Sequence, residues 1–149
     1  MDNDKVKSLM RKYLGDLVDL PELQYLFVDD PEKEYRCIRY YSKNFSHLHK
    51  CILRTNYYPR INDYLEEYLQ LYNNINQVDI NGCTALHLAS YYSRTRSTER
   101  TVELLINAGV ARADIYLKNN YNKTPFDYFD DELKDKYLGR YTKRAIKNN

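Results

Sequence analysis

The spacing of apolar residues is helical in several separate segments of the chain. Apolar positions at i, i+3, i+4 and i+7 mark one face of a helix, and Leu65, Tyr68, Leu69 and Tyr72 have this spacing. Residues Val102, Leu105 and Ile106 give a second apolar face of the same kind. The pattern therefore predicts an all-helical chain with very little sheet.

Helices are also predicted at both ends. Residues 4–14 (DKVKSLMRKYL) and 21–28 (PELQYLFV) fit two amphipathic helices, and the sequence DDP at 29–31 then interrupts the chain. Asp130 or Asp131 can cap a last helix running from Glu132 to about Lys147. We expect residues 1–40 to form an N-terminal helical cap and the last helix to form a C-terminal one.

Three stretches of the chain align with one another, which indicates an internal repeat. Placing Thr84 on Thr124 puts Gly82 on Asn122, an offset of 40 residues. Placing Ser46 on Thr84 puts Asn44 on Gly82 and His49 on His87, an offset of 38 residues. Glycine and asparagine enter the left-handed backbone region at the lowest cost. The alignment is therefore consistent with one turn geometry used three times.

Residues 79–118 resemble an ankyrin repeat, because DINGCTALHLAS and VELLINAG follow the pattern of that family. The unit is 40 residues long, against about 33 in the family, and part of the excess is a polar insertion, SRTRSTER at 93–100. The resemblance implies an all-α ankyrin-repeat solenoid of about three repeats in a single domain, residues 1–149. The expected repeats are a degenerate one at 41–78, a clear one at 79–118, and a last repeat with the cap helix at 119–149.

Several residues have structural roles in this interpretation. Thr84 and Thr124 can cap helices through their hydroxyls, and Pro125 suits a first helical position. Gly82 supplies the turn, and Gly109 ends a helix. The resemblance implies that His87 is structural as well, with its ring bonded to the backbone of neighbouring turns.

The family resemblance also implies a function, which is non-enzymatic binding of another protein, with the chain a monomer. It places binding positions on the exposed hairpin loops of the repeats, called fingers, on the surface of the first helix of a repeat, and in the insertion at 93–100. They are Ile80, Asn81, Cys83, Asn120, Tyr121 and Lys123 on the fingers, Tyr91 and Tyr92 on the helix, and Arg94 and Arg96 in the insertion.

Two other kinds of site are alternatives. His47, His49, Cys51 and Cys37 are ligand types that zinc accepts, but they lack the usual paired spacing. No nucleophile and base are placed for catalysis, so no enzyme activity, metal or cofactor is expected. Residues 36–60 hold six Lys or Arg and no acid, and residues 133–149 are also basic. A small nucleic-acid-binding or regulatory factor using these two surfaces is therefore the alternative function.

Composition bears mainly on the cellular compartment and on the kind of organism the protein comes from. The net charge is +2, and three cysteines, Cys37, Cys51 and Cys83, suit reduced thiols in the cytoplasm or nucleus. No apolar run has the length of a membrane helix, and the first residues do not form a signal peptide. Short, divergent ankyrin proteins rich in Asn, Lys and Tyr resemble those of large DNA viruses or intracellular bacteria. The expected partner is then a host protein.

Overall fold

The structure, a computed structural model, describes residues 3–28, 45–108 and 113–137. These residues are helical, in turns or irregular, with no strand among them, so the prediction of an all-α fold is confirmed. Residues 131–137 form a helix. The other helices are α1 (Asn3–Leu14), η1 (Gly15–Asp19), η2 (Pro21–Phe27), α2 (His47–Ile52), α3 (Ile61–Leu71), α4 (Ala85–Tyr91), α5 (Glu99–Ile106) and η4 (Pro125–Tyr128).

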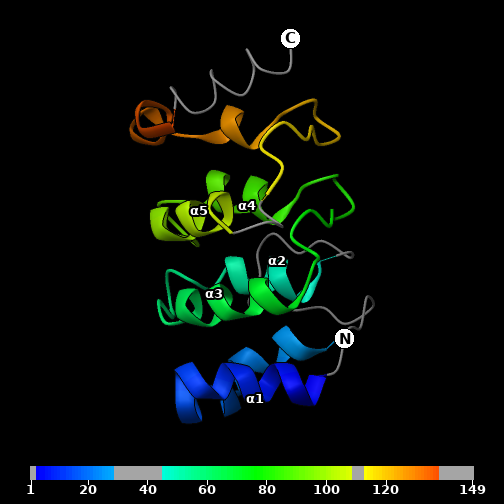
Figure 1. Cartoon of the computed structure of the whole chain (residues 1–149), viewed down its shortest axis with the longest axis vertical. Helices are drawn as coiled ribbons and strands as arrows, with labels where there is room; N and C mark the ends of the chain where they lie inside the picture. The colour runs from blue at the N-terminus through cyan, green and yellow to red at the C-terminus, as the bar shows by residue number, and fades with distance from the viewer. Residues whose placement is uncertain (1–2, 29–44, 109–112, 138–149) are drawn as a thin grey trace.

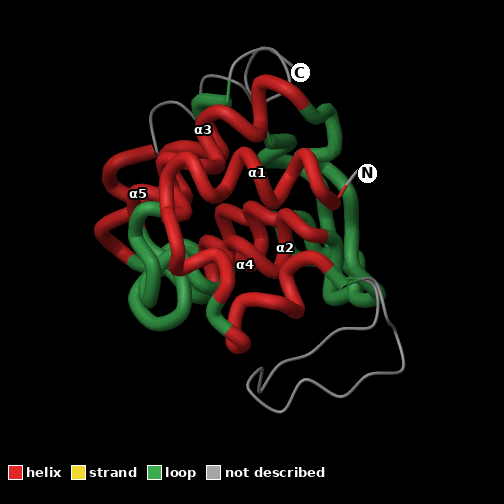
Figure 2. Tube along the Cα trace, turned by 90° about the horizontal axis from the view of Figure 1, so that it is seen from below, coloured by secondary structure: helices red, strands yellow, loops and turns green. Residues whose placement is uncertain are grey.

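The helices stack in layers along the long axis of the molecule (Figure 1). The N-terminal layer, residues 3–28, lies at one end and is followed by the α2–α3 layer, the α4–α5 layer, and η4 with residues 131–137. The loops that lead into α4 and η4 project to the same side of the stack, which Figure 2 shows from the end. Among the described residues, no helix is long and apolar enough to cross a membrane.

The N-terminal layer differs from the prediction in its helix type. Residues 4–14 are helical as expected, but the second predicted helix, at 21–28, is the short 3₁₀ helix η2, and a further 3₁₀ helix, η1, lies between the two. Gly15 has φ +59°, a left-handed conformation that ends α1. Leu20 is extended, with ψ 135°, because the following Pro21 disfavours helical geometry in the residue before it. These two breaks confine η1 and η2 to five and seven residues.

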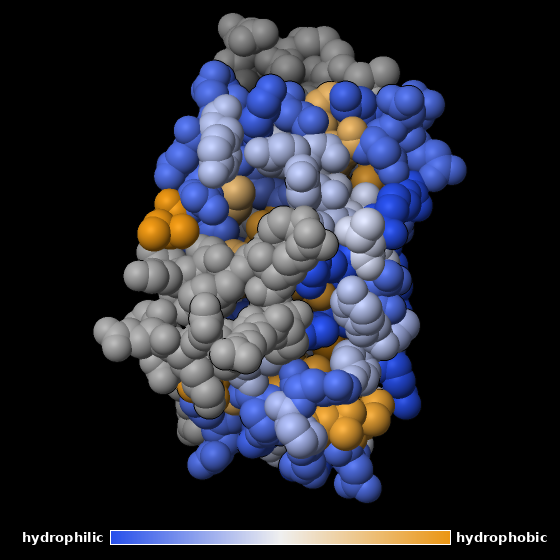
Figure 3. All heavy atoms as spheres, turned by 180° about the vertical axis from the view of Figure 1, so that it is seen from behind, coloured by the Kyte–Doolittle hydropathy of each residue, from blue (hydrophilic) through white to orange (hydrophobic). Residues whose placement is uncertain are grey.

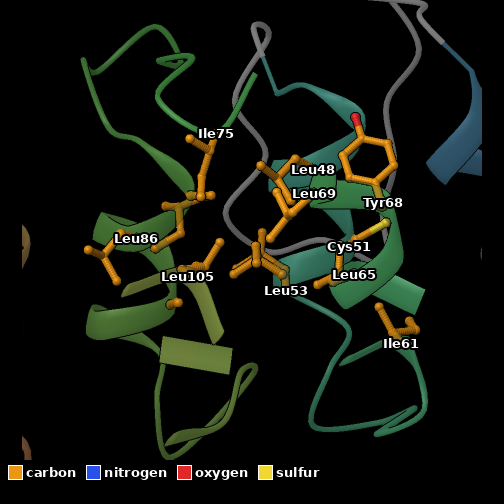
Figure 4. Packing of buried hydrophobic residues seen from close by; sticks show 14 of the residues in the cluster. Leu48, Cys51, Leu53, Ile61, Leu65, Tyr68, Leu69, Ile75, Leu86 and Leu105 are labelled. Carbon is orange, nitrogen blue, oxygen red and sulfur yellow. The ribbon is translucent and has the colours of Figure 1, made fainter. Parts of the chain in front are cut away.

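The core lies between the layers, as expected for units that cannot bury their own faces. Leu48, Leu65 and Leu69 of the α2–α3 layer lie on the side of Leu105 in the next layer, and Leu86 belongs to the same buried cluster (Figure 4). Tyr64 and Tyr68 are also fully buried, and Tyr25 and Tyr137 nearly so, so at least four of the 17 tyrosines serve the core rather than the surface.

The insertion at 93–100 forms a loop and then starts α5, and it does not lengthen α4, which ends at Tyr91. Its backbone is tied to the preceding layer, because the Asn56 amide donates to the Arg96 carbonyl at 3.3 Å. The Asn56 side chain donates to the Thr95 carbonyl as well. The loop is therefore held in one conformation.

A chain of buried side chains lies beneath this loop. Thr98 caps α5 by accepting from the Thr101 amide at 3.1 Å. The Thr101 hydroxyl donates to Asn62 Oδ1 at 2.7 Å, and Ser97 and Thr55 are hydrogen-bonded at 3.0 Å. Part of the predicted partner-binding insertion thus lies inside the protein. Removing residues 95–98 would therefore delete the cap of α5.

Candidate partner-binding surface

The same N-terminal capping box starts three helices, at the three positions that the repeat alignment matched. Thr84 Oγ1 accepts from the His87 amide at 3.3 Å, while His87 Nδ1 accepts from the Thr84 amide at 3.0 Å. Ser46 and His49 form the first box, and Thr124 and Asp127 form the third. Two otherwise unpaired backbone donors are satisfied in each box. Pro125 takes the first position of its helix, as predicted, although that helix is a four-residue 3₁₀ turn.

The histidines of the first two boxes also bind the unit that follows. His49 Nε2 donates to the Cys83 carbonyl and His87 Nε2 donates to the Lys123 carbonyl, both at 2.9 Å. A carbonyl only accepts, so Nε2 must carry the hydrogen and Nδ1 must be the acceptor inside the box. Burial lowers the pKa of both histidines, which keeps them neutral in this arrangement.

The next feature is a pair of matching turns, which we call the first finger (residues 79–83) and the second finger (residues 119–123). Asp79 Oδ1 accepts from the amides of Asn81 and Cys83 at 2.8 and 2.9 Å. Asn119 Oδ1 does the same for Tyr121 and Lys123, at 3.0 Å in each case. Such side-chain-closed turns hold a loop in one shape without regular secondary structure.

The left-handed position of each finger is filled as the alignment requires, with Gly82 at φ +74° and Asn122 at φ +61°. The two fingers also contact each other. The Asn120 amide donates to the Asn81 carbonyl at 2.9 Å, and the Asn120 side chain donates to the Ile80 carbonyl at 3.1 Å. The fingers therefore form one continuous surface.

Replacing Gly82 with alanine is expected to destabilise the protein by about 2 kcal/mol. A Cβ there would be strained by the positive φ, which costs about 1–2 kcal/mol. It would also lie 2.7 Å from Asn120 Oδ1 and 3.0 Å from Asn120 N, against the second finger. Urea unfolding followed by circular dichroism measures the change.

Gly15 is the matched control, because it has φ +59° with nothing within 4 Å of its added Cβ. Gly15→Ala should therefore show only the backbone strain. If both substitutions had equal effects, the contact between the fingers would contribute nothing.

Most of the predicted finger residues are exposed at the tips. Ile80 and Tyr121 expose 53% and 64% of their surface, and Asn81, Asn120 and Lys123 are exposed too. Figure 3 shows one face of the molecule, on which hydrophilic residues predominate and apolar ones form only small separate groups. Within the fingers, Ile80 and Tyr121 have exposed polar neighbours in Asn81, Asn120 and Lys123, and a mixture of large and polar side chains is common in protein interfaces.

Three tyrosines, which we call the tyrosine cluster, lie beside the fingers. The Tyr91 ring meets the Tyr92 and Tyr128 rings edge to face, with centroids 4.8 and 5.4 Å apart. Tyr91 is 62% exposed, whereas Tyr92 and Tyr128 are half-buried. The Tyr128 hydroxyl accepts from Asn119 Nδ2 at 2.9 Å, so the cluster is joined to the base of the second finger.

Sequence reasoning did not select Tyr128. One feature of the sequence could have pointed to it. The 40-residue offset aligns Tyr128 with Leu88, so a side chain with a polar tip takes the place of leucine.

Two predicted partner-binding residues are placed differently from the prediction. Cys83 is buried: its amide donates to the Asp79 side chain, its carbonyl accepts from the Asp79 amide, and its sulfur accepts from Asn119 Nδ2 at 3.4 Å. Arg94 is exposed, but it is paired with Asp130 at 2.8 Å and with Glu132 at 2.5 Å. Arg96 is half-buried, and its carbonyl binds Asn56. Cys83 and Arg94 therefore serve contacts within the fold.

The structure also bears on the two alternative sites, the possible zinc ligands and the basic segment at 36–60. Both nitrogens of His47 and of His49 are hydrogen-bonded within the protein, and no group of ligand residues among those described could hold a metal ion. In the basic segment, Lys50 donates to the Val28 carbonyl at 2.5 Å and Arg54 donates to the Tyr25 hydroxyl at 2.5 Å. Cys37, residues 36–44 and the helix stop predicted at Gly109 lie outside the described residues.

Comparison with known proteins gives one result. The ankyrin-repeat family model matches residues 81–120, the stretch that contains the second capping box and part of each finger. No curated protein and no solved structure gave a match. Ankyrin repeats generally serve as non-enzymatic modules for protein–protein interaction. The match shows an ankyrin repeat at residues 81–120, within an all-helical stack that has recurring capping boxes.

Proposed function

We propose that this protein is a non-enzymatic binding module that engages a partner protein through its two fingers and the tyrosine cluster. The observation that carries the proposal is the exposure of Ile80, Tyr121 and Tyr91, three large side chains held on one connected surface. Turns closed by side chains hold the first two, and ring contacts hold the third. Binding to such a preformed surface costs little conformational entropy.

The proposed surface carries few charges, so recognition is expected to rest on aromatic contacts and hydrogen bonds. The finger tips offer the side-chain amides of Asn81 and Asn122 next to Ile80 and Tyr121. Tyrosine combines a large apolar area with a polar tip and is enriched among the residues that dominate binding energy. Nucleic acid, which is bound mainly through phosphate contacts, has few cationic partners on this face.

Replacing Tyr91 and Tyr121 with alanine is expected to weaken partner binding by about 2 kcal/mol or more, the usual cost of losing anchor residues. Folding should change little, because both side chains are more than half exposed. The partner is first identified by affinity capture with quantitative mass spectrometry. Its affinity is then measured for the parent and for the double variant, with thermal melting alongside.

Tyr57→Ala is the matched control, because Tyr57 is 53% exposed and lies in the loop between α2 and α3, away from the fingers. Partners that are lost with the double variant but kept by Tyr57→Ala support the proposal. A partner bound equally by all three proteins would contradict it. Binding that falls steeply with salt and is displaced by random DNA or RNA would favour the nucleic-acid alternative instead.

A further inference from the structure

His47 is a buried titratable group that the partner-binding surface does not use. It lies at the junction between the N-terminal layer and the α2–α3 layer. Its Nδ1 is 2.7 Å from the Leu26 carbonyl of η2, and its Nε2 is 2.7 Å from the Tyr64 hydroxyl of α3. The Phe27 ring lies 5.5 Å away on the other side of the junction.

These two partners fix the protonation of the ring. The Leu26 carbonyl can only accept, so Nδ1 carries the hydrogen. Nε2 is then a lone-pair acceptor and receives the hydrogen of the Tyr64 hydroxyl, with Cys51 Sγ also 3.4 Å away. Tyr64 is fully buried, so its hydroxyl depends on this acceptor within the protein.

We propose that His47 is a proton-sensitive latch, and that uptake of one proton at its Nε2 releases the N-terminal layer from α2 and α3. The proton comes from solvent and forms an N–H bond, and no other covalent bond changes. Nε2 then becomes a donor, so the Tyr64 hydroxyl must turn to accept and its own hydrogen loses its acceptor. A buried cation and an unsatisfied hydroxyl are both costly.

The groups around His47 do not offset such a charge. From α2 it is faced by Lys50 and Cys51, from α3 by Tyr64 and Tyr68, and from η2 by the Leu26 carbonyl and the Phe27 ring. No carboxylate among the described residues faces it. His49 and His87 differ in this respect, because Asp79 acts on both of them and Asp127 acts on His87.

The same burial sets the pH range of the latch. Burial lowers the pKa of His47 from an ordinary 6.5 to about 4, and separating the layers restores the ordinary value. The contribution of the closed junction is therefore complete above about pH 6.5 and is lost as the pH falls toward 4. Between pH 7 and pH 5 the ratio of open to closed junction should rise about twentyfold, from the difference between these two pKa values.

Hydrogen exchange followed by mass spectrometry at pH 7 and pH 5, corrected for the intrinsic exchange rate, tests the proposal. The amides of α1 and η2 should exchange about twentyfold faster at pH 5, and those of α4 and α5 should change less. In His47→Asn the side-chain amide can still donate to the Leu26 carbonyl but does not titrate, so the extra acceleration in residues 3–28 should vanish. His87→Asn should retain it.

Equal acceleration in every layer of the parent protein would overturn the proposal. An unchanged pH response of residues 3–28 in His47→Asn would overturn it too. Should His47→Asn fail to fold, the comparison between layers in the parent protein still decides.

Discussion

Replacing Leu105 with alanine is expected to destabilise the protein by about 2–5 kcal/mol, the range for emptying a well-packed leucine site. Leu105 is fully buried where the α4–α5 layer meets the α2–α3 layer (Figure 4). A stack of units is held together by contacts between neighbouring layers. A cavity at this position therefore weakens the attachment of two layers at once. Urea unfolding followed by far-ultraviolet circular dichroism measures the loss.

Leu71→Ala is the matched control, since the same atoms are removed from a side chain that is 64% exposed at the end of α3. Its effect should stay within about 0.5 kcal/mol, as is usual at surface sites. If Leu105→Ala unfolded at the same urea concentration as Leu71→Ala, the layers would not be held together by this core.

The second large effect is expected from His87→Ala, at about 3 kcal/mol. The Thr84 amide and the Lys123 carbonyl both lose their partner, and a buried group left unsatisfied costs about 1–3 kcal/mol. The loss should appear in thermal melting, and partner binding should fall only to the extent that folding does. Unchanged melting together with abolished binding would show instead that His87 touches the partner.

Asp127→Ala separates the two roles of the histidine. Asp127 takes the same place in the third capping box and accepts from the Thr124 amide at 2.8 Å, but it is exposed and its carboxylate cannot donate to a further unit. Its loss should cost about 1 kcal/mol, typical of a cap. If Asp127→Ala destabilised the protein as much as His87→Ala, the hydrogen bond from His87 to the Lys123 carbonyl would contribute nothing to stability.

Much of the fold could be predicted from local sequence patterns. The helix type of most segments, the buried stripe of Leu65, Tyr68 and Leu69, and the threonine caps all follow from rules that act over a few residues. The left-handed positions of Gly82 and Asn122 followed from the internal alignment, because a repeated backbone geometry requires the same residue types each time.

The side-chain surroundings of the candidate surface could not be predicted in the same way. Whether Cys83 faces solvent depends on how the second finger lies against the first, and Arg94 finds Asp130 and Glu132 only when the next unit is in place. Tyr128 joins the tyrosine cluster through a contact with Tyr91, which comes from another unit. The 3₁₀ helices of the N-terminal layer depend on local breaks at Gly15 and Pro21, which a periodicity of apolar residues does not reveal.

The change from histidine to aspartate along the three capping boxes makes the two sides of a unit different: the first two boxes can bond a following finger, and the third cannot. His49 and His87 each present an N–H to the finger that comes next, whereas Asp127 presents only acceptors at the same place. A finger appended beyond the third box would bring a carbonyl against a carboxylate, and two acceptors repel each other. Lengthening the array by duplicating a unit at that end would therefore require one particular codon change, Asp127 to histidine, before the new unit could be bonded like the others.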